Sequence, residues 1–192
     1  MGKTIPGTRV EIRNADASGV GEVWVSGPTV MKGYLHEPEK TAEVLEGEWL
    51  ATGDLGKLDP TGHLQLTGRL RNMIVTEGGK NIYPEDVESA FSDLYSTEES
   101  CVFATNYIWP KDELTGETLT LVVRPREGEE AENLVEAVDA RNRKLAEHKR
   151  IRNILLWEDE FPRTASMKVK RLDLATQVQE MDREALVVRS LP

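Results

Sequence analysis

Two different sequence patterns meet in the stretch Gly68-Arg69-Leu70-Arg71-Asn72-Met73-Ile74-Val75. Before it, short alternating segments such as residues 8–12 and 22–25 are separated by glycine and proline clusters, a pattern typical of β-strands and tight turns. After it, apolar residues at helical spacing alternate with short apolar runs, which is typical of a small α/β domain. The junction lacks the composition of a flexible linker, so any hinge there would be compact.

The pattern on each side of the junction predicts a different architecture. Residues 1–68 predict a small barrel or sandwich of short strands, with a turn at Asp59-Pro60-Thr61-Gly62 and a return strand after it. Residues 71–180 predict a central mixed sheet flanked by helices, and residues 181–192 form a tail. The fold class is therefore a mixture of α+β and α/β. The expected elements of the second part are strands near 73–75, 99–104, 119–123 and 154–157, and helices from Pro84, over about 128–148 and from about Leu172.

Composition excludes several classes of protein. The 192 residues carry 34 acidic and 24 basic side chains, a net charge of −10, so the chain lacks the basic excess of a general nucleic-acid binder. The single cysteine, Cys101, excludes an intramolecular disulfide and is typical of a reducing compartment. No apolar run approaches the roughly 20 residues of a transmembrane helix, and the N-terminus has no signal-peptide core. We expect a cytoplasmic protein, with peripheral membrane attachment left open.

The segment Thr52-Gly53-Asp54 is the first candidate for binding. A carboxylate on a glycine-flanked turn can accept hydrogen bonds from both hydroxyls of a ribose, and the nearby Arg69 can hold the same sugar or a phosphate. Taken alone, a structural Asx-turn is the more frequent role of such an aspartate.

Two further segments carry glycines or cations. In Gly78-Gly79-Lys80 the glycines would let a ligand approach the backbone beside a cation. Taken alone, this segment is more often a plain hairpin turn, and its spacing is not that of a P-loop. The stretch 161–171 holds four cations, among them Lys168, whose flexible ammonium can be delivered to developing negative charge. Taken alone, this stretch is more often a solvated basic loop. The three histidines, His36, His63 and His148, show no metal-ligand spacing, so no metal site is predicted.

In combination, these segments resemble the adenylate-forming superfamily of acyl-CoA synthetases, nonribosomal adenylation domains and luciferases. The resemblance runs in order through residues 21–35, Thr52-Gly53-Asp54, Gly68-Arg69, residues 78–88 and residues 162–171, and it spans essentially the whole chain. Within this superfamily, the sequence most resembles acyl-CoA synthetases such as long-chain fatty-acid-CoA ligases. The resemblance implies that residues 1–68 are the β-rich end of the large AMP-binding N-terminal domain, and that 71–180 are the C-terminal lid domain.

The resemblance also implies a role for each site residue. Asp54 would bind the ribose hydroxyls of ATP, and Arg69 would contact ribose or phosphate. Arg71 would be the hinge about which the lid rotates between half-reactions. Gly78, within Gly78-Gly79-Lys80, would lie beside the pantetheine tunnel. Lys168 would be the catalytic lysine of the adenylation step, contacting the carboxylate and the α-phosphate.

The chain departs from the family at two positions. Met167 stands where the family most often has glycine, so the loop before Lys168 is expected to be stiffer. Arg71 replaces the usual aspartate or lysine of the hinge but keeps a charge. The family's phosphate loop would lie upstream, so we expect a fragment that is inactive alone and needs the remainder of the N-terminal domain as its partner.

The implied ligands are ATP, CoA, a carboxylic acid (a fatty acid by resemblance) and Mg²⁺ bound mostly outside the chain. Two alternatives stay open. One is an acyl-AMP ligase or adenylation domain that loads a carrier protein, because both acceptors present pantetheine. The other is a non-catalytic interaction module that kept the fold.

Overall fold

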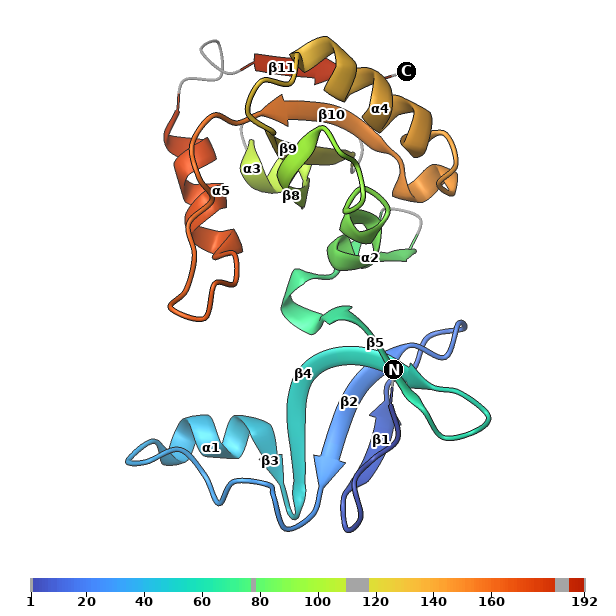
Figure 1. The fold of residues 1–192 in the computed structure, drawn as a ribbon. Coiled ribbons are helices and arrows are strands. Elements are labelled where there is room, and N and C mark those ends of the chain that lie inside the picture. Colours follow the sequence, from blue (N-terminus) through green and yellow to red (C-terminus); the bar gives the residue numbers. More distant parts are fainter. Residues whose placement is uncertain (1, 77–78, 110–117, 182–186, 192) are drawn as a thin grey trace. The chain divides into compact units, whose positions relative to one another are not determined.

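A computed structural model describes residues 2–76, 79–109, 118–181 and 187–191. The chain divides into two compact units, Met1–Met73 and Ile74–Pro192 (Figure 1). The division falls two residues after Arg71, which lies in a short 3₁₀ helix, η1 (Leu70–Asn72).

One antiparallel sheet dominates the first unit. Its longest strand, β4, pairs with β2 along one edge and with β3 and β5 along the other, while β1 pairs with β2. The elements are β1 (Arg9–Arg13), β2 (Gly21–Ser26), α1 (Pro38–Val44), β3 (Leu45–Glu46), β4 (Trp49–Leu58) and β5 (Leu64–Arg69). Among the described residues the unit forms a single sheet in which β1 and β5 do not pair, and the N-terminal segment reaches β5 through one bridge between Gly2 and Leu64. The expected closed barrel or two-sheet sandwich is therefore not formed within this unit.

The hairpin between β4 and β5 follows the predicted turn. The carboxylate of Asp59 accepts hydrogen bonds from the backbone N–H of Thr61 at 2.8 Å and of His63 at 2.9 Å. These bonds hold the chain reversal, because a short aspartate side chain satisfies donors that the turn would otherwise leave unpaired. The return strand β5 begins directly after it.

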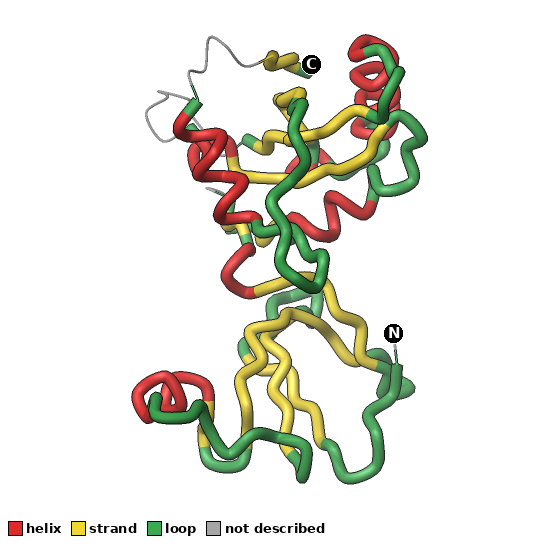
Figure 2. Tube along the Cα trace, turned by 60° about the vertical axis from the view of Figure 1, so that its left-hand side comes forward, coloured by secondary structure: helices red, strands yellow, loops and turns green. Residues whose placement is uncertain are grey.

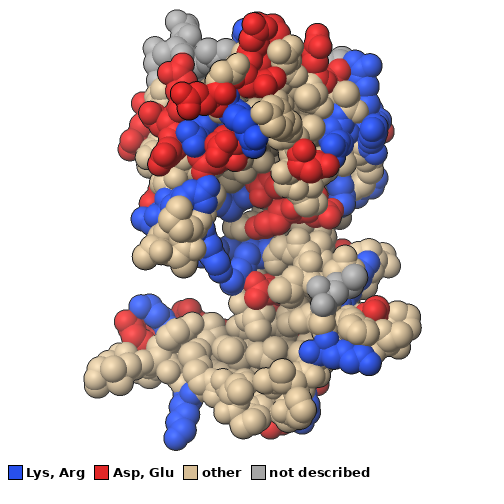
Figure 3. Space-filling view, viewed as in Figure 1, with Lys and Arg blue, Asp and Glu red and all other residues tan. Residues whose placement is uncertain are grey.

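Apolar burial is sparse in the first unit. Its buried large hydrophobic side chains, among the described residues, are Val20, Val23 and Leu55. One face of the unit shows uncharged side chains over its centre and charged ones toward its margins (Figure 3). The exposed large hydrophobic residues of the unit are Ile5, Tyr34, Leu35, Leu58, Leu66 and Leu70.

The second unit is built on a four-stranded mixed sheet in the order β11-β10-β9-β8. Strands β9 and β10 are parallel, as a crossover through a helix requires, and the outer pairs are antiparallel. The strands are β8 (Thr97–Ala104), β9 (Leu119–Pro125), β10 (Ile151–Leu156) and β11 (Val187–Ser190), and a separate hairpin joins β6 (Ile74–Val75) to β7 (Asn81–Ile82). The helices are α2 (Pro84–Ser89), α3 (Thr105–Ile108), α4 (Ala131–Asn142), η2 (Glu147–Lys149) and α5 (Arg171–Glu180).

Alternating side chains send the sheet's apolar residues into two cores. On β9, Leu121 and Val123 pack with α2 and α4, whereas Val122 between them packs with α3 and α5. Cys101 belongs to the second core, as its apolar strand predicts. Helices therefore lie on both faces of the sheet (Figures 1 and 2). The predicted mixed sheet flanked by helices is confirmed.

The helix expected over about 128–148 is shorter than predicted. Helix α4 ends at Asn142, whose buried side chain donates to the Ile151 carbonyl at 2.9 Å and accepts from the Ile151 N–H at 2.7 Å. These two bonds tie the end of α4 to the start of β10, and the chain continues into the short η2.

The C-terminal tail, residues 181–192, has no element predicted from its sequence. In the structure it adds β11 to the free edge of β10 and buries Leu191 in the core that also contains Leu121 and Val123.

Candidate functional site

Asp54 lies on an irregular stretch of β4. Between Ala51 and Leu55 the strand contains two more residues than the opposing stretch of β2, and Gly53 absorbs the excess at φ +67°. The Thr52 hydroxyl fixes the bulge, because it donates to the Val23 carbonyl at 2.7 Å and accepts from the Asp54 N–H at 3.1 Å. The expected glycine-flanked turn is thus a strand bulge, which is an irregularity that local sequence cannot distinguish from a turn.

An extra residue of β5, Thr67, shifts the register against β4 so that Asp54 lies opposite Arg69. These residues are direct partners in β4 and β5, and the Arg69 Nε atom lies 2.7 Å from a carboxylate oxygen of Asp54. The Arg69 guanidinium also reaches the Thr52 carbonyl at 3.5 Å. The Asp54 side chain keeps 30% of its surface exposed, so it can still accept hydrogen bonds from a ligand while its charge is partnered.

The predicted glycine segment belongs to the β6–β7 hairpin of the second unit. Gly78 lies outside the described residues. Gly79 adopts φ +72° and donates its N–H to the Thr76 carbonyl at 2.8 Å, and the Lys80 N–H reaches the Thr76 hydroxyl at 3.0 Å. This conformation alone accounts for the glycine at position 79, because a side chain there would be strained.

Lys80 is exposed and lies close enough to His148 to affect the pKa of its imidazole. Partial burial, together with the positive charges of Lys80 and Lys149, lowers the pKa of His148 from its ordinary value. Burial is the larger of these two effects, and Lys149 is also paired with Asp86.

Lys168 stands on a tight hairpin between β10 and α5. Thr164 N–H donates to the Lys168 carbonyl at 2.8 Å, and Met167 N–H donates to the Thr164 carbonyl at 2.9 Å. This pattern is a three-residue loop whose last residue takes the left-handed conformation, and Met167 does so at φ +63°. Glycine is preferred at such a position, so the family's preference for it has a direct conformational cause.

The other cations of this stretch are engaged. Arg163 pairs with Glu99, Lys170 pairs with Asp173 at 3.0 Å, and Arg171 pairs with Glu88 at 2.5 Å. Lys168 is exposed and has no ion-pair partner within the described part of the chain. Its ammonium is therefore available for a ligand.

Two carboxylates hold the ends of the Lys168 segment against the sheet. Glu99 of β8 binds Arg163 before the hairpin, and Glu88 of α2 binds Arg171 after it. Arg171 also donates to the Val102 carbonyl, while Glu88 accepts the Val102 N–H at 2.6 Å, so the pair closes the outer edge of β8. Sequence analysis missed both anchors. Glu99 sits in a polar–apolar strand pattern that gives no local sign of a buried ion pair.

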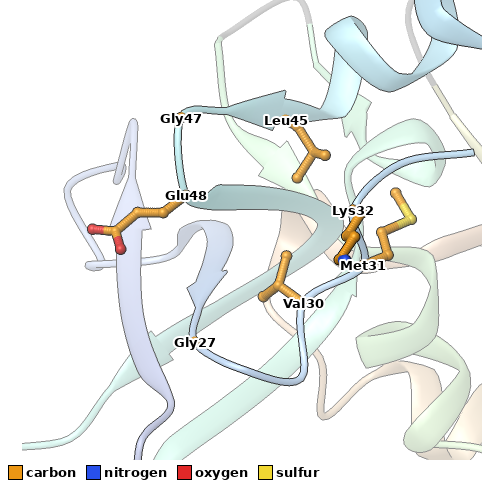
Figure 4. A pocket seen from close by; sticks show the side chains of 7 residues that line it. All are labelled: Gly27, Val30, Met31, Lys32, Leu45, Gly47 and Glu48. Atoms are coloured by element: carbon orange, nitrogen blue, oxygen red, sulfur yellow. The ribbon is translucent and has the colours of Figure 1, made fainter.

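A pocket of about 330 Å³ lies elsewhere in the first unit (Figure 4). None of the predicted site residues lines it. Its carboxylate, on Glu48, points away from the other lining side chains in the close-up and pairs with Arg9 at 2.5 Å. The pocket thus lacks the convergent polar groups that typify a ligand site.

The structure thus brings Asp54 and Arg69 together in the first unit, whereas Lys80 and Lys168 stand on two separate hairpins of the second. Within the described ranges there is no group of three His, Cys, Asp or Glu side chains that could hold a metal ion. None of the helices in the described part of the chain combines the length and apolarity that crossing a bilayer takes.

Comparison with known proteins gives one consistent class. The chain is 47% identical over 90 residues to the long-chain-fatty-acid–CoA ligase ACSBG1 of Mus musculus, covering 46% of this chain and 12% of the relative. It is 36% identical over 176 residues to the 2-succinylbenzoate–CoA ligase of Lactococcus lactis, covering 91% of this chain and 35% of the relative. The chain thus spans well under two thirds of these relatives. No protein-family model matches it.

Solved structures show the same likeness over most of the chain. The amide bond synthetase McbA from Marinactinospora thermotolerans matches with a TM-score of 0.74 at 33% identity, over 92% of this chain and 36% of that one. The o-succinylbenzoate CoA synthetase MenE from Bacillus subtilis, solved with ATP and a magnesium ion, matches with a TM-score of 0.74 at 29% identity, over 90% of this chain and 35% of that one.

Proposed function

Because the chain corresponds in sequence and fold to the C-terminal part of adenylate-forming enzymes, we propose that it completes the active site of an ATP-dependent acid–thiol ligase. In the first half-reaction a carboxylate oxygen attacks the α-phosphorus of ATP, which gives an acyl-adenylate and releases pyrophosphate. In the second, the thiol of CoA attacks the acyl carbon and AMP leaves.

The availability of Lys168 supports this proposal most directly. Its ammonium is exposed and has no ion partner among the described residues, whereas the three cations around it are paired. Lys168 would contact the attacking carboxylate and the α-phosphate, where negative charge builds in the transition state. Charge-assisted donors of this kind act most strongly when they are held in place before the reaction.

Asp54 and Arg69 would hold the nucleotide. The partly exposed carboxylate of Asp54 can accept hydrogen bonds from the two ribose hydroxyls. The Arg69 guanidinium, already beside it, would contact the ribose or a phosphate. Mg²⁺ would accompany ATP and be held mostly by residues outside this chain.

We also propose that residues 1–68 are the β-rich end of the large nucleotide-binding domain and that residues 71–180 are the lid. The sparse core of the first unit supports this assignment, because a sheet with so few buried side chains needs a further layer to cover it. The remainder of that domain would be the partner, and residues 1–192 alone would be inactive. Pyrophosphate exchange by the purified chain should stay at background with any carboxylic acid.

A fatty acid is the proposed acyl donor, because the mouse relative is named for long-chain fatty acids. The Lactococcus relative is named for an aromatic acid, so a panel that contains both acid classes is the appropriate assay. CoA is the proposed acceptor. A carrier protein presents the same pantetheine thiol, and comparing acyl transfer to free CoA and to a holo carrier protein distinguishes them.

The decisive experiment is Lys168→Ala in the full-length enzyme, with each half-reaction assayed separately. Adenylation should fall by about 10²–10³, the usual effect of losing one transition-state donor. Thioester formation from supplied acyl-adenylate should change little. Equal losses in both steps would mean that Lys168 acts through folding, and unchanged adenylation would mean that Lys168 is not catalytic. A full-length parent protein that adenylates no carboxylic acid at all would favour a non-catalytic interaction module.

A further inference from the structure

We propose that Arg163 is a positioning residue for Lys168 and that the buried carboxylate of Glu99 holds Arg163 in place. The inference rests on the proposed function of Lys168 in adenylation. It adds a link between the central sheet and the hairpin that carries the lysine.

Glu99 is the fixed end of this link. It lies on β8, and its side chain is only 7% exposed. Its carboxylate accepts hydrogen bonds from Arg124 Nε at 2.9 Å and from the Phe161 N–H at 3.1 Å, and it pairs with Arg163. A carboxylate this deeply buried is stable only when its oxygens are well partnered. Because the sheet and the core residue Phe161 both position it, Glu99 offers a rigid anchor.

Arg163 spans from this anchor to the hairpin tip. One of its terminal nitrogens pairs with Glu99, and the other, Nη1, donates to the Met167 carbonyl at 2.6 Å. That carbonyl belongs to the peptide bond that joins Met167 to Lys168. The forked guanidinium can make both contacts at once, whereas a lysine ammonium at position 163 would be a single point charge.

The bridge compensates for an awkward backbone. Met167 occupies a left-handed conformation that costs a non-glycine residue free energy. The bond from Arg163 stabilises the loop in this conformation and fixes the orientation of the peptide before Lys168. A displacement of about 1 Å in a catalytic group can cost up to about 10²-fold in rate, so a loose hairpin would weaken adenylation with Lys168 still present.

The test uses the full-length enzyme with Arg163→Met, Arg163→Lys and Glu99→Gln. Arg163→Met should lower kcat of adenylation about 10- to 100-fold, with little change in thioester formation from supplied acyl-adenylate. Arg163→Lys should restore only a small part of the loss, because it keeps the charge without the fork. Combining Glu99→Gln with Arg163→Met should be no worse than the poorer single variant, as expected when two residues act through one link.

Glu98→Gln is the matched control. Glu98 neighbours Glu99 on β8, but its side chain is 46% exposed and pairs with Arg126 at 3.6 Å. It should leave both half-reactions unchanged. Amide hydrogen exchange over residues 164–168 should accelerate in Arg163→Met and stay unchanged in Glu98→Gln. This second readout holds even if Glu99→Gln folds poorly.

Three results would overturn the inference. Adenylation by Arg163→Met within twofold of the parent, while Lys168→Ala is crippled, would show that the bridge does not position the lysine. Equal losses in both half-reactions would show a general structural role. If Lys168→Ala leaves adenylation unchanged, the proposed role of Lys168 fails and the inference fails with it.

Discussion

The guanidinium of Arg69 and the carboxylate of Asp54 form an ion pair at 2.7 Å across directly opposed positions of β4 and β5. The pair depends on the extra residue Thr67 in β5, which shifts the register of β5 against β4 next to Asp54. A charged pair of this kind at the sheet surface contributes little to stability, about 0–1 kcal/mol. A substitution in this pair can therefore test the proposed role in nucleotide binding with little effect on folding.

Asp54→Asn should separate these two roles. The variant keeps a hydrogen-bond acceptor but loses the charge, so we expect the KM for ATP in adenylation by the full-length enzyme to rise about 10-fold or more, in line with a lost charge-assisted bond. The free energy of unfolding should fall by no more than about 1 kcal/mol. Glu46→Gln, which breaks an exposed pair with Arg13 in the same sheet, should leave the KM unchanged. A large loss of stability with an unaltered KM would assign Asp54 a structural role.

Met167→Gly should stabilise the hairpin. A non-glycine residue at φ +63° pays about 1–2 kcal/mol, while glycine loses about 0.5–1 kcal/mol through its greater freedom in the unfolded chain. The net gain in the free energy of unfolding, measured with urea, should thus reach up to about 1.5 kcal/mol. Ala165→Gly, in the same exposed loop but without a positive φ, should instead destabilise. The interpretation is wrong if the two substitutions have the same sign.

The second unit was largely predictable because its signals are local. Short continuous apolar runs in β8, β9 and β10 mark strands that are buried on both faces, and Pro84 marks the start of α2. The elements that escaped prediction depend on distant contacts. The end of α4 is set by bonds from Asn142 to β10, and β11 forms only because β10 offers a free edge.

The residues of the candidate site also fall into those that the sequence predicts and those that depend on distant contacts. Asp54, Arg69 and Lys168 are found from motif order, and the chemistry of each side chain suits its proposed role. Glu99 and Arg163 escape this approach because their importance lies in a pairing across more than 60 positions of sequence. The bulge at Gly53 was also mistaken for a turn, since a glycine with positive φ serves both structures.

His148 should report on Lys80 through its own titration. Burial and the nearby Lys80 and Lys149 lower its pKa below the ordinary 6.5. The unfolded chain therefore binds this proton more readily, so the contribution of His148 to stability is present above pH 6.5 and is lost as the pH falls through that value toward the folded pKa.

In Lys80→Gln the pKa of His148, followed by NMR, should move up toward 6.5, because one of the two positive charges is gone. Lys149→Gln should move it in the same direction. An unchanged titration curve in both variants would leave burial as the sole cause of the shift.

Arg71→Pro should stop the lid from changing position while leaving each unit folded. Arg71 lies in η1, just before the division between the two units, and is exposed. Proline fixes φ near −65°, which suits a 3₁₀ helix but prevents the backbone at this position from adopting a second conformation. If the lid rotates about Arg71, one half-reaction should persist near its normal rate while overall turnover collapses, and the melting temperature should change little.

Arg71→Ala is the control, because it keeps backbone freedom and should preserve both half-reactions. Proline also disfavours the helical conformation of Leu70 before it, so a large fall in melting temperature would indicate local unfolding, and normal turnover in the folded variant would rule out the hinge.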